Sequence, residues 1–322
     1  MDSSWQEPGY CVYSDWLKQH YGEKVYKIPV NIPVSCPNRD GTIGLGGCIY
    51  CGKTGGGQEN LPCTISIKAQ ILQTRTLIEK RYKARKFIPF FQSFSNTYLP
   101  FNEFKAAVEE AIQGENIVGL AIATRPDCIF DEFLDYLQQI QAKNKIDVTI
   151  ELGLQTSNDT TLKIINRGHT LGDYIQSAIK VKQFGLSLCT HVILDLPWDG
   201  HQDVVTTAQV ISAVGTDFVK CHALYVEPHT ILANMLACGD IVLFDQNEYI
   251  ERCILFLKHI NPYVIIQRII GRSPAKDSIV TNWNSSWWKV RDCLHERLAE
   301  KKITQGMLYG ENYKAIRNQL EI

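Results

Sequence analysis

Three cysteines in a glycine-rich stretch are the residues whose types and spacing best suit chemistry. Cys36, Cys48 and Cys51 occur in SCPNRDGTIGLGGCIYCGKTGGG, residues 35–57, with the spacing C-x11-C-x2-C. The glycines free the backbone to adopt dihedral angles that other residues avoid, so thiolates this close in sequence can converge on one centre. The stretch therefore predicts a metal-binding or iron–sulfur loop.

The rest of the chain alternates short apolar runs with amphipathic segments of helical length. Strands alternating with helices predict repeated β–α units and a parallel sheet. Six or seven units are too few for a closed eightfold barrel and favour an α/β fold of the open, partial (β/α)6-type TIM barrel. The predicted strands are 25–34, 87–94, 117–125, 147–155, 186–197, 217–226 and 263–270, and the predicted helices between them are 65–86, 102–113, 131–142, 159–184, 201–213 and 246–260.

Polar residues follow or end several of these apolar runs. Active sites of parallel α/β folds lie at the carboxyl ends of the strands, so these residues are expected to share one rim with the cysteine loop. The strand-end residues are Gln92, Ser93, Ser95, Asn96, Thr97, Thr124, Arg125, Asp127, Glu151, Gln155, His191 and Asp195.

The chain divides into a cover segment, a barrel and an extension. Residues 1–24 carry a short predicted helix around 13–20, and the barrel spans 25–270. Residues 271–322 are interpreted as a helical, Trp-rich extension with Trp283, Trp287, Trp288 and several Lys and Arg residues. Aromatics interleaved with cations can contact nucleic acid, or they can cap the open end of the barrel, which is the reading we favour.

Composition limits the possible partners. The 322 residues are 45% hydrophobic and carry a net charge of −1, which is typical of a globular protein and argues against recognition of a polyanion by bulk charge. A basic run over 80–86 is the main local exception, and such runs are usually solvated helix faces. Without a long apolar run or a signal-like start, the chain is expected to be cytoplasmic and not bound to membranes.

Several motifs resemble the radical S-adenosylmethionine (radical SAM) superfamily, in particular the YhcC-like family related to the Elongator catalytic subunit. CPNRDG followed by GGCIYC is similar to the cluster loop of that group, whose first gap is longer than the common C-x3-C-x2-C. TRPDC at 124–128 and the segment 150–197, with ELGLQ, RGH and LDLP, are similar in the same order. The resemblance covers roughly residues 20 to 310 and implies a barrel of the radical SAM kind.

The resemblance implies two cofactors. Cys36, Cys48 and Cys51 would hold one [4Fe-4S] cluster and leave one iron open for SAM. Residues 92–97 would bind the SAM amino group without the acidic residue often found there, Tyr50 would lie near the adenine, and Gln155 and Arg167 would hold the ribose and carboxylate. The implied SAM contacts are Tyr50, Ser93, Ser95, Asn96, Thr97, Gln155, Arg167, His191 and, at the rim, Glu151.

A structural zinc site is the alternative for the loop. Zinc normally takes a fourth Cys or His, which Cys63 or His20 would have to supply, and no second C-x2-C occurs. Zinc would also leave the polar strand ends unexplained.

Three functions follow from these patterns. The first is radical SAM modification of tRNA at the wobble uridine, by resemblance to the Elongator group. The second is radical SAM chemistry on a small metabolite. The third, from another class, is a non-catalytic iron–sulfur or zinc protein that binds nucleic acid or a partner. Either enzyme would need a reductant protein such as flavodoxin or ferredoxin, and the oligomeric state stays open.

Overall fold

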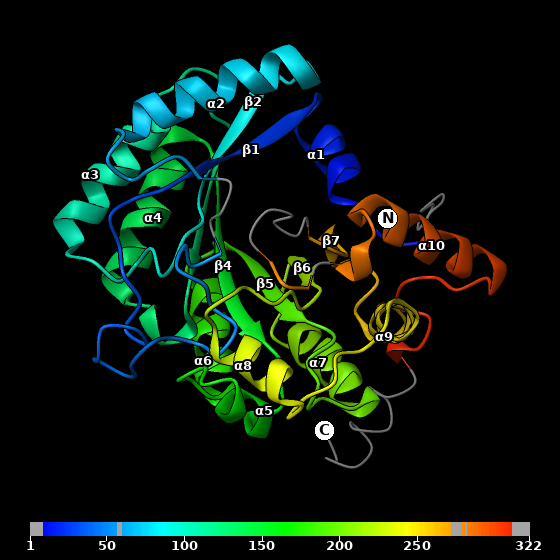
Figure 1. The fold of residues 1–322 in the computed structure, drawn as a ribbon. Helices are drawn as coiled ribbons and strands as arrows, with labels where there is room; N and C mark the ends of the chain where they lie inside the picture. Colours follow the sequence, from blue (N-terminus) through cyan, green and yellow to red (C-terminus); the bar gives the residue numbers. More distant parts are fainter. Residues whose placement is uncertain (1–8, 57–59, 272–277, 281, 311–322) are drawn as a thin grey trace, which may run out of the picture.

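The computed structural model describes residues 9–56, 60–271, 278–280 and 282–310. Its centre is a parallel sheet in which the strand order follows the chain order from β1 to β7. The sheet curls into a partial barrel with most helices on its outside (Figure 1). The strands are β1 Val25–Val30, β2 Lys86–Phe91, β3 Gly119–Thr124, β4 Asp147–Gln155, β5 Ser187–Ile193, β6 Phe218–His222 and β7 Ile265–Arg268.

Helices connect the strands, as the amphipathic segments predicted. Their apolar faces pack on the outer face of the sheet, where side chains such as Phe87, Phe91 and Ile150 are fully buried. The connecting helices are α2 Ile67–Tyr82, α3 Phe101–Ile112, α4 Asp131–Asn144, α5 Asp159–Ile164, α6 Leu171–Gln183, α7 His201–Ala213, α8 Ile231–Cys238 and α9 Gln246–His259. The prediction of an open parallel barrel is confirmed.

Two connections differ from the sequence prediction. The single helix predicted over 159–184 is two helices, because Asn166 and Gly168 adopt positive φ angles of 51° and 76° that break the helical path. The short helix α8 was not predicted. It begins at Ile231, where the Thr230 hydroxyl accepts a hydrogen bond from the Ala233 amide.

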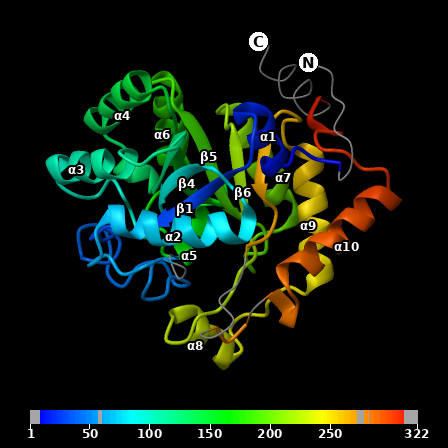
Figure 2. The same cartoon turned by 90° about the horizontal axis from the view of Figure 1, so that it is seen from above.

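The amino-terminal segment lies against both edges of the open sheet. Helix α1, Tyr13–Tyr21, contacts β1 and β7, and the Ile266 amide donates to the Cys11 carbonyl at 2.8 Å. The rings of Tyr13 and Trp16 lie 5.5 and 4.9 Å from Phe218. Figure 2 shows α1 at the end of the barrel opposite α8 and the loop that follows β1. Residues 1–8 of the predicted cover lie outside the described residues.

The carboxyl-terminal segment packs on α9. A 3-10 turn at Asn282–Asn284 precedes α10, Trp287–Glu300, and Arg297 and Lys301 form ion pairs with Glu251 of α9. Trp283 and Trp287 pack against the core, whereas Trp288 is 46% exposed. Residues 272–277, 281 and 311–322 of the predicted extension lie outside the described residues.

The basic run lies at the end of the sheet away from the cysteine loop. Arg81 belongs to the last turn of α2, and Lys86 begins β2 and pairs with Glu23 at 3.1 Å. The six residues of β2 place this run about 20 Å from the carboxyl rim. No described helix combines the length and apolar character that a bilayer span requires.

The Gln305 side chain links its own segment to the amino-terminal segment and to the turn between α9 and β7, so its loss should destabilise the fold. Its carbonyl oxygen accepts from the Cys11 amide, and its amide group donates to the carbonyls of Asn261 and Val264. We predict that Gln305→Ala lowers the free energy of unfolding by about 2–4 kcal/mol, because buried backbone groups lose their partners. Urea unfolding measures this. The exposed Gln183→Ala is the control, expected within about 0.5 kcal/mol of wild type, and equal stability of the two variants would contradict the assignment.

Candidate metal centre

The cysteine loop folds back on itself directly after β1. The Gly47 amide donates to the Asn38 carbonyl at 2.8 Å, and the Cys51 amide donates to the Cys48 carbonyl at 2.9 Å. A Cβ at Gly44 would lie 2.4 Å from Oδ1 of Asn38, so a larger residue there would displace the Asn38 side chain. These contacts hold the two ends of the C-x11-C segment together.

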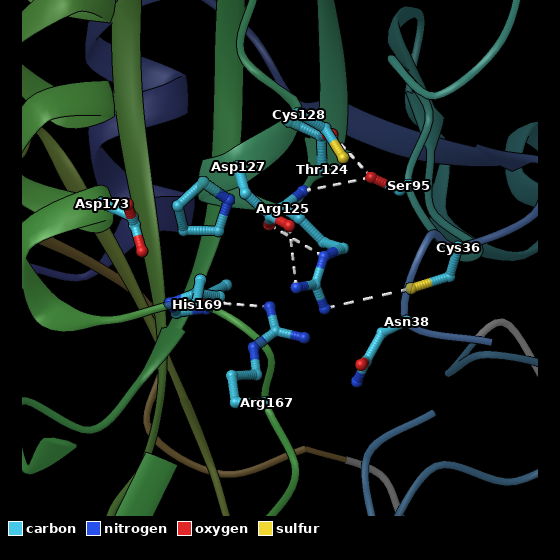
Figure 3. A network of polar contacts seen from close by, with 12 residues as sticks. Cys36, Asn38, Ser95, Thr124, Arg125, Asp127, Cys128, Arg167, His169 and Asp173 are labelled. Atoms are coloured by element: carbon cyan, nitrogen blue, oxygen red, sulfur yellow. Dashed lines mark hydrogen bonds and ion pairs between the residues drawn. The ribbon is translucent and has the colours of Figure 1, made fainter. Parts of the chain in front are cut away.

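Each loop thiol lies against a different guanidinium group. Nη1 of Arg39 lies 3.3 Å from Sγ of Cys51. Nη1 of Arg167 lies 3.6 Å from Sγ of Cys48, and Nη1 of Arg125 lies 4.0 Å from Sγ of Cys36. Figure 3 shows Arg125 and Arg167 on the side of Cys36 that faces the strand ends. Three cations around three sulfurs suit a metal centre of net negative charge.

Arg125 and Arg167 are themselves fixed by the strand ends. Arg125, directly after β3, is held by a two-pronged ion pair with Asp127 at 2.9 and 3.0 Å. Nη2 of Arg167 donates to the Gly153 carbonyl at 2.7 Å, at the point where the pairing of β4 with β5 is irregular. A Cβ at Gly153 would lie 2.6 Å from that nitrogen, so glycine permits the approach.

His169 completes the support around Gly153. Its Nε2 lies 3.1 Å from the Gly153 carbonyl and its Nδ1 lies 3.1 Å from the Thr170 carbonyl, so whichever nitrogen carries the proton can donate to a backbone carbonyl. Burial, with Arg167 nearby, lowers the pKa of His169 to about 3. A neutral imidazole here adds no charge to a site that already carries three guanidinium groups.

The donor set fits an iron–sulfur cluster better than zinc. Zinc bonds of about 2.3 Å would bring the three sulfurs within about 3.8 Å of one another. Within the described residues, the one set of three ligating groups closer than 4.8 Å is Glu151, Cys189 and His191, so the loop thiols are spread more widely than zinc requires. His20 cannot be the fourth ligand, because it bonds Asp147 at the amino end of β4.

Protonation of the loop also bears on cluster binding. Burial, together with the neighbouring Cys48, raises the pKa of Cys51 to about 11, although Arg39 opposes this change. The Cys51 thiol is therefore protonated at neutral pH, and metal binding has to release that proton.

The predicted contacts after β2 are occupied by protein groups. The Ser95 and Thr97 hydroxyls bond Thr124, and Thr97 also donates to the Cys128 carbonyl. The Asn96 amide donates to three backbone carbonyls, while its Oδ1 is buried without a partner among the described residues. Ser93 accepts from Asn60. These bonds shape the rim, and the role of the four residues as SAM contacts stays a prediction.

Three other predicted contacts gather around the loop. Tyr50 lies between the last two cysteines and packs on the apolar cluster that contains Ile193 and Leu224. Burial raises the pKa of the Tyr50 hydroxyl well above its usual value. Gln155 ends β4 with φ 76°, and Arg167 contacts Cys48. Their proposed contacts with SAM also stay predictions.

The placement of Glu151 at the rim is wrong. Four residues of β4 follow it, and its buried carboxylate accepts from Lys27, Lys220 and His191 in the barrel interior. His191 likewise lies two residues before the end of β5 and points at Glu151. The pairing of β4 with β5 continues past Glu151 and His191, so both residues lie below the rim.

Sequence reasoning expected Arg167 in the site but assigned no role to the other two cations. Arg39 stands in the CPNRDG motif, and Arg125 stands in TRPDC, but neither was assigned a role. The signal was available for Arg39, which lies three residues after Cys36. Arg125 was expected at the rim as a strand-end residue, but only the fold shows that its guanidinium group lies against Cys36.

The chain thus combines an open parallel barrel with three cysteine thiols at its carboxyl rim, a donor set that suits an iron–sulfur centre. The model of the radical SAM superfamily matches residues 31–211, and that of the radical SAM C-terminal domain matches residues 216–300. The chain therefore belongs to the radical SAM superfamily, and it is an enzyme of that class.

Individual relatives agree with this assignment. The chain is 32% identical to protein YhcC of Escherichia coli over 91% of this chain and 93% of that one. It is 29% identical to a tRNA uridine(34) acetyltransferase of Methanocaldococcus jannaschii over 49% of this chain and 29% of that one. The structure of Elp3 from Methanocaldococcus infernus matches with a TM-score of 0.65 at 17% identity, over 87% of this chain and 64% of that one, and this likeness shows the fold.

Removal of one loop thiol should abolish cluster binding. We predict that wild type takes up about four iron and four sulfide per chain on anaerobic reconstitution, whereas Cys48→Ala retains little of either. Iron and acid-labile sulfide analysis measures this. Cys238→Ala is the matched control, because Cys238 is exposed at the end of α8. Full loading of Cys48→Ala would refute the ligand assignment.

Proposed function

We propose that this enzyme binds a [4Fe-4S] cluster through Cys36, Cys48 and Cys51, cleaves SAM reductively, and modifies the wobble uridine of tRNA. The observation that carries the proposal is the set of three rim thiols, each against its own guanidinium group. Cys36, Cys48 and Cys51 would hold the cluster, which would pass one electron from an external reductant to SAM and so supply radical chemistry for the substrate.

The protein's own residues prepare the site in two ways. Arg39, Arg125 and Arg167 offset the negative charge of the thiolates, which stabilises a centre of net negative charge. Nε of Arg167 is buried without a hydrogen-bond acceptor among the described residues. A carboxylate bound at this guanidinium group would gain charge-assisted hydrogen bonds, which supports Arg167 as a contact for the SAM carboxylate.

The apolar cluster beside the loop protects the chemistry from water. Tyr50, Ile49 and Leu232 pack there, and the Leu232 amide donates to the Ile49 carbonyl at 3.0 Å. Helix α8 therefore closes the rim on the side of the last two cysteines. Exclusion of water limits quenching of a reactive intermediate.

Two observations support tRNA as the substrate. About half of the chain is similar to a tRNA uridine(34) acetyltransferase. In addition, α10 carries the exposed Trp288 with the Lys289 ammonium 5.6 Å from its ring centre, a pair able to stack on and neutralise nucleic acid. The basic run at Arg81 lies at the opposite end of the barrel and does not contribute to the rim.

A small metabolite is the second candidate substrate. The net charge of −1 favours it, because binding of nucleic acid usually depends on many cationic contacts. In either case a small reductant protein, flavodoxin or ferredoxin, is the proposed electron donor.

SAM cleavage tests the enzymatic part of the proposal. We predict that the reconstituted protein, reduced with dithionite in the presence of SAM, forms 5'-deoxyadenosine and methionine, which liquid chromatography quantifies. Cys48→Ala should form none, and Cys238→Ala should match wild type. Absence of 5'-deoxyadenosine from a wild-type sample with an intact cluster would defeat the proposal.

The nucleosides of tRNA test the substrate. We predict that a strain lacking the gene loses one modified uridine species, detected by mass spectrometry of digested tRNA. Expression of the wild-type chain should restore it, and expression of Cys48→Ala should not. An unchanged nucleoside profile in the deletion strain would exclude tRNA and leave the small metabolite.

A further inference from the structure

A charged network fills the barrel interior below the cysteine loop. At its centre Glu151 is 1% exposed, and its two oxygens accept from side chains on three other strands. Oε1 accepts from Lys27 of β1, and Oε2 accepts from Lys220 of β6 and from His191 of β5 at 2.7 Å. Both carboxylate oxygens are thus engaged within the protein.

The hydrogen bonds continue in one direction from β7 to Glu151. An arginine can only donate, and Nη2 of Arg268 lies 2.8 Å from Nδ1 of His222 and 3.2 Å from its Nε2, so Nδ1 is the nearer acceptor. Nε2 of His222 then donates to Nδ1 of His191 at 3.2 Å, and Nε2 of His191 donates to Glu151. Both imidazoles are neutral in this arrangement. Burial lowers the pKa of His191 to about 4 and that of His222 well below its usual value, which agrees.

The network has more positive than negative charge. Lys27 and Arg268 are cations, and Lys220, whose pKa burial lowers to about 8, is mainly protonated at neutral pH. Glu151 is the one carboxylate among the described residues that pairs with any of them. Other titratable groups do not compensate, because burial raises the pKa of the Tyr13 and Tyr225 hydroxyls to about 12 and that of the Cys189 thiol further, which keeps them neutral. Excess buried charge of one sign is unfavourable unless an opposite charge joins it.

Two buried N–H donors without an acceptor indicate where an anion could bind. Nε of Arg268 and Nε2 of the neighbouring Gln267 are buried without an acceptor in the part of the chain that the structure describes. Both residues stand at the carboxyl end of β7, and His222 ends β6 beside them. In the parallel sheet this is the same end at which the cysteine loop follows β1.

The network is not completely covered by protein. The side chains of Lys27 and His191 keep 16% and 17% of their exposure, and Arg268 is half-buried. A metal ion does not suit the place. Glu151, Cys189 and His191 lie within 4.8 Å of one another, but lysine ammonium groups already hold the carboxylate and the net charge repels a cation.

We propose that Arg268, with Lys220, binds an anionic group of the substrate, a carboxylate or a phosphate, at the floor of the reaction chamber. This proposal rests on the proposed function, since it assumes that the substrate enters the barrel beside the cluster. The anion accepts hydrogen bonds from the Arg268 guanidinium and restores the balance of charge. The substrate class is therefore an acidic small molecule or an acidic group attached to the reacting nucleoside.

Titration with simple anions tests the site without the substrate. The full-length protein, as purified and after reconstitution, is titrated with acetate, phosphate and the uncharged acetamide at constant ionic strength, and the thermal midpoint is recorded. Wild type should show a saturable shift with acetate or phosphate and none with acetamide. The anion that binds more tightly identifies the group as a carboxylate or a phosphate.

Variants locate the binding. Arg268→Gln should weaken the apparent affinity about tenfold or more, the usual effect of losing a charged hydrogen bond. Arg81→Gln, at an exposed position on α2, is the control and should match wild type. General salt effects act on both variants alike. Lys220→Met provides a second test if Arg268→Gln does not fold.

The outcomes separate this proposal from the proposed function. Absence of a saturable shift with either anion, or unchanged affinity in Arg268→Gln and Lys220→Met, would overturn the anion site while SAM cleavage stands. Conversely, failure of SAM cleavage leaves the titration result unchanged, because the titration requires neither SAM nor a reductant.

Discussion

The contact between each rim thiol and its own guanidinium group is the interaction on which the site depends. The loop that carries Cys36, Cys48 and Cys51 has no regular secondary structure beyond an isolated bridge. Arg125 and Arg167 join it to β3 and β4, and both are held by protein acceptors, Asp127 and the Gly153 carbonyl. The regular strands thereby impose their geometry on an irregular loop. The same charges stabilise the thiolates, so one set of contacts serves both position and electrostatics.

Because the barrel is not closed, the edges β1 and β7 have to be covered by other parts of the chain. Seven strands leave β1 and β7 as edges, and the chain covers these edges in place of an eighth strand. Lys27 of β1 donates to Gln267 of β7 at 3.1 Å across the gap, and α1 lies against both strands. Below the charged layer an apolar layer that includes Leu17, Val25 and Ile88 closes the amino end. The amino end of the barrel is therefore covered by apolar side chains, whereas the cysteine loop stands at the carboxyl rim.

Much of the architecture was predictable because it depends on local patterns. Every predicted strand is present, since buried parallel strands read as short apolar runs between helical segments. The turn at Asn166 and Gly168 was missed, because a short break with positive φ hardly disturbs the helical period of 159–184. Glu151 was wrongly placed at the rim. Its depth in the barrel depends on how far β4 pairs with β5, and that pairing extends to Gln155.

The sequence by itself determined the spacing of the three loop cysteines and the order of the β–α units, because both are properties of position along the chain. Only the tertiary structure decided which cation meets which thiol: Arg125 and Cys36 are 89 residues apart, and Arg167 and Cys48 are 119 apart. The same holds for Glu151 and its lysines, which come from β1 and β6. Such pairs depend on strand register and on the curl of the sheet, and these are properties of the whole fold that no local pattern records.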